Sequence, residues 1–191
     1  MRIIAGTMKG RRLQAPDWPG LRPTSDKLRE TLFNLLAPRI AGARLLDAYA
    51  GTGAVGIEAL SRGAAHVTFV DRDPRAVALI EANLRHCGVT GRYAIIRAGL
   101  SDLAVAPLPF DLIFLDPPYD SAELASALDA AERLAGHGTV LIIEHAKRDK
   151  PPERPGTLIR TRSLTSGDSA LTLYSRRTTP PQADVNGMSG I

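Results

Sequence analysis

The segment with the clearest chemical content is an apolar run, residues 111–115, that breaks into Asp116-Pro117-Pro118-Tyr119. An amine conjugated to a purine ring is a poor nucleophile, because its lone pair is delocalised into the ring. The Asp116 carboxylate and the Pro117 carbonyl are suited to accept the two hydrogens of such an amine and to localise its lone pair. Pro118 helps to hold that carbonyl rigidly, and Tyr119 can stack on an extruded base. The alternative is a Pro-Pro turn with an aspartate cap.

A glycine-rich turn follows the first predicted strand, residues 43–47. Gly51, Gly53 and Gly56 match the G-x-G-x-x-G pattern, which permits a tight turn and lets a ligand approach backbone N–H groups at a helix start. Asp71, twenty residues after Gly51, is placed to bind a ribose. A nicotinamide-dependent oxidoreductase would use the same turn and the same acid, so this pattern leaves that enzyme class open.

Asp47 separates the two cofactors. Its negative charge, four residues before Gly51, would oppose a pyrophosphate but suits the ammonium group of a methionine moiety, which favours S-adenosylmethionine over NAD. The alternative is that Asp47 fixes the turn by hydrogen bonds to the backbone. Asp73 directly precedes Pro74 and is therefore expected to cap a helix. The ribose hydroxyls are accordingly assigned to Asp71.

Continuous apolar runs alternate with helical stretches from residue 43 onward, which is typical of a parallel sheet covered on both faces. The predicted strands are 43–47, 66–71, 93–97, 110–115, 139–144, 157–163 and 169–176. The predicted helices are 54–62, 74–87, 101–104 and 121–135. The last two strands are too close for a crossover and should form an antiparallel hairpin. The expected fold is a doubly wound, Rossmann-like α/β domain with a seven-stranded, mostly parallel sheet.

The region before this sheet has its own pattern. Residues 2–5 and 11–14 flank a turn-prone segment and predict a small hairpin. A helix is expected from Asp26, with Pro38 beyond its end. Its apolar face would carry Leu28, Leu32, Leu35 and Leu36. Its exposed face would carry Lys27, Arg29, Glu30 and Asn34. We therefore divide the chain into an N-terminal hairpin and helix (1–40), a cofactor-binding domain (41–177) and a disordered tail (178–191).

Charge is distributed unevenly along the chain. Residues 1–39 hold eight basic and three acidic side chains, a net charge of +5, whereas the remaining 152 residues sum to −1. This pattern predicts a polyanionic partner that is gripped from one side through its phosphates. The alternative is a solvated basic surface without a partner.

Composition excludes several classes of protein. No apolar stretch is long enough to span a membrane and no signal-type segment is present, so a cytoplasmic protein is expected. Cys87 is the single cysteine and cannot form an internal disulfide, and the four histidines lack metal-ligand spacing. We expect neither a metal site nor a membrane partner, and nothing in the sequence requires more than a monomer.

Together these residues resemble the S-adenosylmethionine-dependent amino-methyltransferases, whose motifs are the glycine loop and an Asp-Pro-Pro-Tyr-type segment after the fourth strand. Over residues 1–176 the chain more specifically resembles the bacterial 16S rRNA (guanine-966-N2)-methyltransferase family. The segments that carry this resemblance are Met1 to Gly6, Lys9-Gly10-Arg11, Arg22-Pro23-Thr24, Arg29 to Asn34, Leu46-Asp47, Ala50 to Ala54, Gly56, Glu58 to Ala64 and Asp116 to Tyr119. Adenine-N6 and glutamine methyltransferases share the Asp-Pro-Pro-Tyr motif. The N-terminal arm, with Arg22-Pro23-Thr24 and Arg29 to Asn34, is more selective for this family.

The resemblance implies transfer of one methyl group from S-adenosylmethionine to a guanine N2 of 16S rRNA, with small-subunit particles preferred over free RNA. The residues expected to bind the cofactor are Asp47, Ala50, Gly51, Thr52, Gly53, Asp71, Arg72, Gly99 and Leu100. The residues expected to contact RNA are Arg2, Lys9, Arg11, Arg22, Thr24, Lys27 and Arg29.

The stretch Arg97-Ala98-Gly99-Leu100 departs from related methyltransferases, which often carry an acidic or amide residue facing the adenine at this place. A backbone N–H of Gly99 or Leu100 is expected to make that contact, with Asp102 as the alternative. Two other functions remain open: an adenine-N6 methyltransferase acting on DNA or RNA, and a ribosome-assembly factor that binds RNA without catalysis.

Overall fold

The computed structural model describes residues 1–16, 18, 26–105, 109–119 and 121–176, so the expected disordered tail lies outside the described residues. The strands are β1 (Arg44–Ala48), β2 (His66–Asp71), β3 (Tyr93–Arg97), β4 (Phe110–Leu115), β5 (Ala135–Ala146), β6 (Leu158–Ser166) and β7 (Ser169–Arg176). The helices are α1 (Asp26–Ile40), α2 (Ala54–Ser61), α3 (Pro74–His86), the short 3₁₀ helix η1 (Leu100–Asp102) and α4 (Ser121–Leu134).

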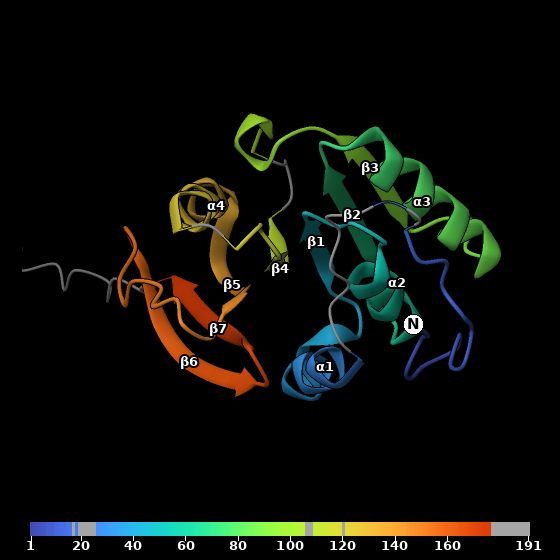
Figure 1. The fold of residues 1–191 in the computed structure, drawn as a ribbon, viewed down its shortest axis with the longest axis horizontal. Helices are drawn as coiled ribbons and strands as arrows, with labels where there is room; N and C mark the ends of the chain where they lie inside the picture. Colours follow the sequence, from blue (N-terminus) through green and yellow to red (C-terminus); the bar gives the residue numbers. More distant parts are fainter. Residues whose placement is uncertain (17, 19–25, 106–108, 120, 177–191) are drawn as a thin grey trace, which may run out of the picture.

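All seven strands belong to one sheet, in the order β3-β2-β1-β4-β5-β7-β6 (Figure 1). The strands from β3 to β5 run parallel, and β7 is antiparallel to both of its neighbours, β5 and β6. The strand order reverses between β1 and β4, which is the point where open α/β sheets bind their ligands. The predicted doubly wound fold and its antiparallel C-terminal hairpin are confirmed.

Helices cover both faces of the sheet (Figure 1). Side chains of successive strand residues point to opposite faces. Leu45 and Phe114 accordingly pack with α1, α2 and α3 in one hydrophobic cluster. Leu46, Ile113 and Leu115 pack with α4 in the other. Because the central strands are buried on both faces, their sequences are continuously apolar, and this is why strand positions could be predicted so closely.

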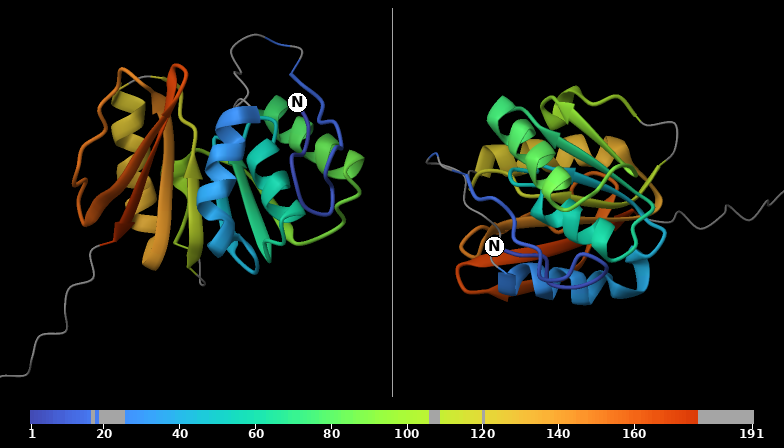
Figure 2. Two further views of the ribbon diagram at one scale, coloured as in Figure 1. Left: turned by 90° about the horizontal axis from the view of Figure 1, so that it is seen from below. Right: turned by 90° about the vertical axis from the view of Figure 1, so that its right-hand side faces the viewer.

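The N-terminal hairpin forms as predicted. The N–H of Ile3 donates to the carbonyl of Arg11 over 2.9 Å, the N–H of Gly10 donates to Ile3 over 2.8 Å, and Arg2 bridges Arg12 in antiparallel fashion. Ile3, Met8 and Leu13 are buried in the same cluster as α1 and α2. Residues 1–16 and α1 therefore share a core with the sheet (Figure 2).

A buried acid attaches the hairpin to α2. The Glu58 carboxylate is fully buried and accepts hydrogen bonds from the backbone N–H groups of Ile4 (2.7 Å) and Ala5 (2.9 Å). Gly6 has a φ of 81°, and a Cβ at this position would come within 1.9 Å of the carbonyl oxygen of Ser61. The hairpin and the end of α2 thus touch backbone to backbone, which only glycine permits.

Two expectations about α1 are wrong. The helix does not end before Pro38 but continues to Ile40, whose buried side chain packs into the core and favours the extra turn. Arg29 does not lie on the exposed face. Its side chain is fully buried, and its guanidinium donates to the carbonyl of Arg2 and to the Asp26 carboxylate. The periodicity of apolar residues predicts which face of a helix is buried. It does not predict burial of Arg29, because that depends on acceptors that the packed hairpin supplies.

Two smaller differences concern strand and helix ends. β5 begins at Ala135, four residues before the predicted start, and the predicted helix 101–104 is the single 3₁₀ turn η1. Within the described part of the chain, no helix is both long and apolar enough to cross a membrane. The same residues contain no group of three or more histidine, cysteine, aspartate or glutamate side chains arranged to hold a metal ion.

Candidate active site

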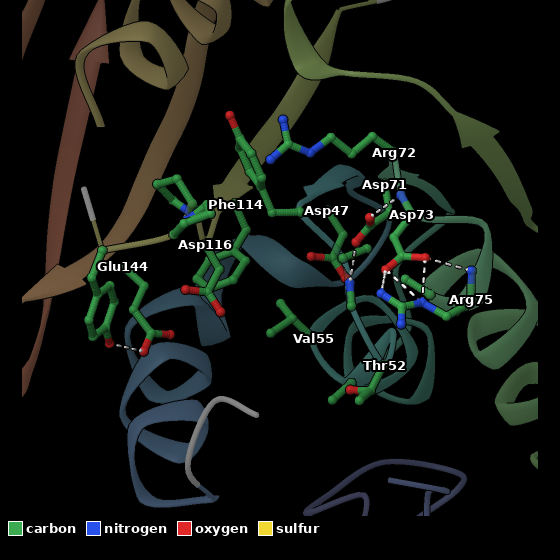
Figure 3. A pocket seen from close by; sticks show the side chains of 18 of the residues that line it. Asp47, Thr52, Val55, Asp71, Arg72, Asp73, Arg75, Phe114, Asp116 and Glu144 are labelled. Atoms are coloured by element: carbon green, nitrogen blue, oxygen red, sulfur yellow. Dashed lines mark hydrogen bonds and ion pairs between the residues drawn. The ribbon is translucent and has the colours of Figure 1, made fainter. Parts of the chain in front are cut away.

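A cavity of about 530 Å³ opens at the carboxyl ends of β1, β2, β4 and β5 (Figure 3). Because these strands are parallel, the acids at or near their carboxyl ends meet at one edge of the sheet: Asp47, Asp71, Asp116 and Glu144. Of the residues predicted for the cofactor and for catalysis, the cavity is lined by Asp47, Ala50, Gly51, Thr52, Asp71, Arg72, Asp116, Pro117, Pro118 and Tyr119. The fold therefore brings together two motifs that are 60 or more residues apart in the sequence.

The glycine loop has the backbone shape that its sequence predicts. Gly51 and Gly53 have φ values of 55° and 75°, in the left-handed region, and α2 begins directly after Gly53. Gly56 packs against β2, where a Cβ would come within 2.2 Å of the Phe69 ring. The first glycines make the turn, and the third allows the helix to lie close to the strand. Gly53 itself does not line the cavity.

Asp47 makes the backbone hydrogen bond that was considered for it and also lies at the cavity. Its carboxylate is buried and accepts the backbone N–H of Gly56 over 2.8 Å, so it fixes the start of α2. It also lines the cavity. Burial raises the pKa of Asp47 to about 8, the Gly56 N–H opposes this rise, and the negative charge of Asp71 adds to it. A cation in the cavity would stabilise the ionised form of Asp47 and lower its pKa. The ammonium group of a ligand would be such a cation.

Asp71 holds the two loops around it in place. One carboxylate oxygen accepts the N–H of Gly51 and the other accepts the N–H of Asp73, each over 2.9 Å. Asp73 is the N-cap of α3, as predicted, and accepts the N–H of Arg75 over 2.8 Å. Asp71 is half-buried and lines the cavity. Its carboxylate therefore holds the glycine loop in place and is also accessible to a ligand in the cavity.

A second cavity of about 170 Å³ adjoins the first. The two share Tyr49, Asp71 and Arg72 among their lining residues. Gly99 and Leu100, the residues expected near the adenine, line this second cavity, whereas Asp102 is not among its lining residues. The two cavities therefore lie on either side of Tyr49, Asp71 and Arg72.

Tyr49 and Trp18 line the cavity and were missed by the sequence analysis. Tyr49 has a φ of 58°, rare for a tyrosine, lines both cavities and donates a hydrogen bond to Glu123 over 3.0 Å. Trp18 lines the first cavity, and the Arg75 guanidinium lies 5.1 Å from its ring centre. For Tyr49, the signal in the sequence was an aromatic residue between the first strand and the glycine loop. For Trp18, it was the single tryptophan of the chain, which lies in the N-terminal segment.

The Asp-Pro-Pro-Tyr segment contacts the next strand. The Asp116 N–H donates to Ala48 over 3.4 Å. The Tyr119 hydroxyl lies 3.2 Å from Oε1 of Glu144, to which it donates, and 2.8 Å from the Ser169 hydroxyl. The pKa of Tyr119 is raised, mainly by burial and also by the charges of Glu144 and Asp116, and the Ser169 contact opposes the rise. Glu144 was missed, although an acid in an apolar strand was its signal.

The predicted RNA-contact residues fall into three groups. Arg2, Lys9, Arg11 and Lys27 are exposed, and Arg11 also donates to the carbonyl of Cys87. Arg29 is buried inside the molecule and presents no charge to a partner. Arg22 and Thr24 lie outside the described residues.

The arm is also joined to the cavity rim. Asn83 accepts the N–H of Gln14 over 2.7 Å and donates to the carbonyl of Thr52, a cavity residue, over 2.9 Å.

A doubly wound sheet with a glycine loop after β1, an acid at the end of β2 and Asp-Pro-Pro-Tyr after β4, all facing one cavity, defines an S-adenosylmethionine-dependent methyltransferase.

Comparison with known proteins gives the family. A family model described as "Conserved hypothetical protein 95" matches residues 1–175, and the chain belongs to this family. It is 37% identical over 179 residues to "Ribosomal RNA small subunit methyltransferase D" of Escherichia coli strain K12, covering 92% of this chain and 90% of that protein. The protein of the same name from Haemophilus influenzae is 36% identical over 180 residues, covering 91% and 93%.

Solved structures agree with this assignment. The structure of yhhF from Escherichia coli superimposes with a TM-score of 0.81 at 32% identity, covering 93% of this chain and 98% of that one. A hypothetical protein of Thermus thermophilus superimposes with a TM-score of 0.76, also at 32% identity, covering 92% and 99%. The chain is thus an S-adenosylmethionine-dependent methyltransferase whose relatives span almost its whole length.

Proposed function

We propose that this enzyme methylates the exocyclic N2 amine of a guanine in 16S rRNA within small ribosomal subunits, guanine 966 by the family resemblance. The observation that carries the proposal is that Asp116-Pro117-Pro118-Tyr119 faces the same cavity as Asp47 and Asp71. The proposal draws its RNA substrate from the relatives, which are named ribosomal RNA small subunit methyltransferases.

The residues present fit S-adenosylmethionine. Asp47, buried and with a raised pKa, is matched to the ammonium group of the methionine part. We assign the ribose hydroxyls to Asp71, which lines the first cavity, and the adenine to Gly99 and Leu100, which line the adjoining one. When bound, the cofactor supplies an electrophilic methyl group on a positively charged sulfur. Asp47 and Asp71 would offer acceptor oxygens to this cationic ligand, whose charge would favour ionisation of Asp47.

Asp116 and Pro117 orient the acceptor amine. Asp116 directly follows β4 and is half-buried, and Pro117 beside it is buried, which limits the movement of the Asp116 carboxylate and the Pro117 carbonyl. Accepting the two amine hydrogens directs the nitrogen lone pair into the cavity. With the cofactor bound, this nitrogen would accept the methyl group and would then lose one proton to solvent. No separate general base is required by this balance.

The target base must leave its stack to reach this site, as in other enzymes that act on nucleobases. The ring of Tyr119 is half-buried at the cavity and is held through its hydroxyl by Glu144 and Ser169. A ring held in this way is suited to stack on the extruded base, a contact that contributes roughly 1–3 kcal/mol per base.

The exposed cations of the hairpin are suited to bind phosphates away from the target. Lys9 and Arg11 lie on the hairpin that contacts Ser61, at the end of α2, whereas the start of α2 lies at the cavity. An eight-residue helix is about 12 Å long. We therefore infer that the hairpin binds RNA phosphates more than one nucleotide away from the methylated base. Such contacts position the substrate without taking part in transfer.

Methyl transfer from labelled S-adenosylmethionine tests the proposal. Unmodified small-subunit particles, naked 16S rRNA and DNA are compared, and the product nucleosides are identified. The proposal expects N2-methylguanosine from the particles. Label in N6-methyladenine would replace guanine by adenine as the substrate. Cofactor binding without transfer to any of the three would remove the RNA substrate and leave the cofactor site.

A further inference from the structure

An orienting site for an amine does not by itself distinguish guanine from adenine. Both bases carry an exocyclic amine, and the Asp-Pro-Pro-Tyr segment can accept the hydrogens of either. The two bases differ at the neighbouring ring nitrogen. N1 of guanine carries a hydrogen, so guanine presents two donors side by side, whereas N1 of adenine is an acceptor. A guanine-specific site needs a second acceptor next to the first.

Glu144 lies where such an acceptor is needed. Leu115 pairs with Ile143 in the parallel ladder of β4 and β5, so Asp116 and Glu144 occupy equivalent positions on neighbouring strands. Neighbouring strands lie about 4.8 Å apart, so the backbone positions of Asp116 and Glu144 are adjacent at the edge of the sheet. Both line the cavity, and Figure 3 shows them on the same side of it.

The position of the Glu144 carboxylate is restrained by its contact with Tyr119. Oε1 of Glu144 accepts the Tyr119 hydroxyl over 3.2 Å, and that hydroxyl also contacts Ser169 over 2.8 Å. The side chain is only 3% exposed, so it cannot swing freely into solvent. A carboxylate offers about four acceptor positions, so one that accepts the tyrosine hydroxyl can also accept a hydrogen from a ligand. The raised pKa of Tyr119 also reflects the nearby charges of Glu144 and Asp116.

We propose that Glu144 determines specificity for guanine by accepting the N1 hydrogen while Asp116 accepts a hydrogen of the N2 amine. Adenine is disfavoured because the lone pair of its N1 would face the carboxylate. This inference rests on the proposed function and deepens it, since it assigns the choice of base to a residue outside the Asp-Pro-Pro-Tyr motif. Tyr119 then serves two contacts, stacking with its ring and restraining Glu144 with its hydroxyl.

The test uses small subunits assembled on ligated 16S rRNA with either guanine or 2-aminopurine at the methylated position. 2-Aminopurine keeps the amine but has no hydrogen on N1. We expect the wild type to prefer guanine in kcat/KM by about 10- to 150-fold, the value of one hydrogen bond to a charged group. Glu144→Gln should reduce this preference to a few-fold, because an amide can accept from one base or donate to the other.

Two further variants separate base reading from support of Tyr119. Ser169→Ala removes the other hydroxyl contact of Tyr119 and should lower kcat/KM for both bases without changing their ratio. Glu144→Asp keeps the carboxylate and should keep most of the preference at a lower rate. Cofactor binding near the wild-type affinity, measured by calorimetry, verifies that each variant is folded.

Equal use of the two bases by the wild type overturns the inference while leaving the proposed function in place. The same follows if Glu144→Gln retains the full preference or if Ser169→Ala changes it as much. If the wild type forms no N2-methylguanosine on guanine-containing particles, the proposed function fails and Glu144 loses this role with it.

Discussion

The buried carboxylate of Asp47 accepts the backbone N–H of Gly56 across 2.8 Å and also lines the cavity at the carboxyl ends of the parallel strands. Burial raises its pKa to about 8, so the carboxyl group is mostly protonated at pH 7 before a cation binds. The native protein therefore binds more protons than the unfolded chain between about pH 4 and pH 8, and the contribution of Asp47 to stability falls as pH rises through this window.

This relationship predicts proton release on cofactor binding. Calorimetry of S-adenosylmethionine binding at pH 7, in two buffers with different ionisation enthalpies, should detect release of about one proton. Affinity should rise as pH increases toward 8, because less work is then needed to ionise Asp47. Asp47→Asn should bind more weakly and release no proton. Equal binding enthalpies in the two buffers would exclude an ionising group at the ammonium site.

Asp116→Ala should strongly reduce methyl transfer and leave cofactor affinity nearly intact. The carboxylate lines the cavity at the end of β4, whereas the ammonium and ribose are assigned to Asp47 and Asp71. Loss of one such electrostatic contact should reduce kcat by roughly 10²–10³-fold. Asp116→Asn keeps one oxygen acceptor and should lose less. A large fall in cofactor affinity in either variant would contradict the assigned role.

Lys9→Ala should weaken binding of the RNA substrate without changing the rate at saturation. The residue is exposed on the hairpin, and removing one phosphate contact should lower the slope of log affinity against log salt by about 0.7 to 0.9. Arg154→Ala is the matched control. It removes an exposed charge beside β6, at the other end of the sheet, and should leave the slope unchanged.

Arg29→Ala should reduce stability, and any loss of RNA binding should follow from that. The side chain is fully buried, and its guanidinium joins α1 to the hairpin through the carbonyl of Arg2. A hydrogen bond to a charged group contributes about 1.5–3 kcal/mol, so Tm should fall by several degrees. Lys27→Ala, at the exposed neighbouring position, should leave Tm unchanged. An unaltered Tm with weaker RNA binding would restore Arg29 as an RNA contact.

Local patterns in the sequence determined the strands, most helix starts, the glycine loop and the Asp-Pro-Pro-Tyr segment. These predictions depend on short-range physical rules: continuous apolar runs in buried parallel strands, a capping acid before Pro74, and glycines where the turn needs a positive φ. Such rules act within a few residues, so they can be applied before the fold is known.

Only the tertiary structure decided which charged and aromatic side chains lie inside. Arg29 is buried because the hairpin carbonyl lies beside it, and Glu144 enters the cavity because β5 is in register with β4. Trp18, from the segment before α1, lines the same cavity as acids at or near the carboxyl ends of four strands of the sheet. Burying a charge is favourable only where partners from other elements are present, and no periodicity within one element records those partners.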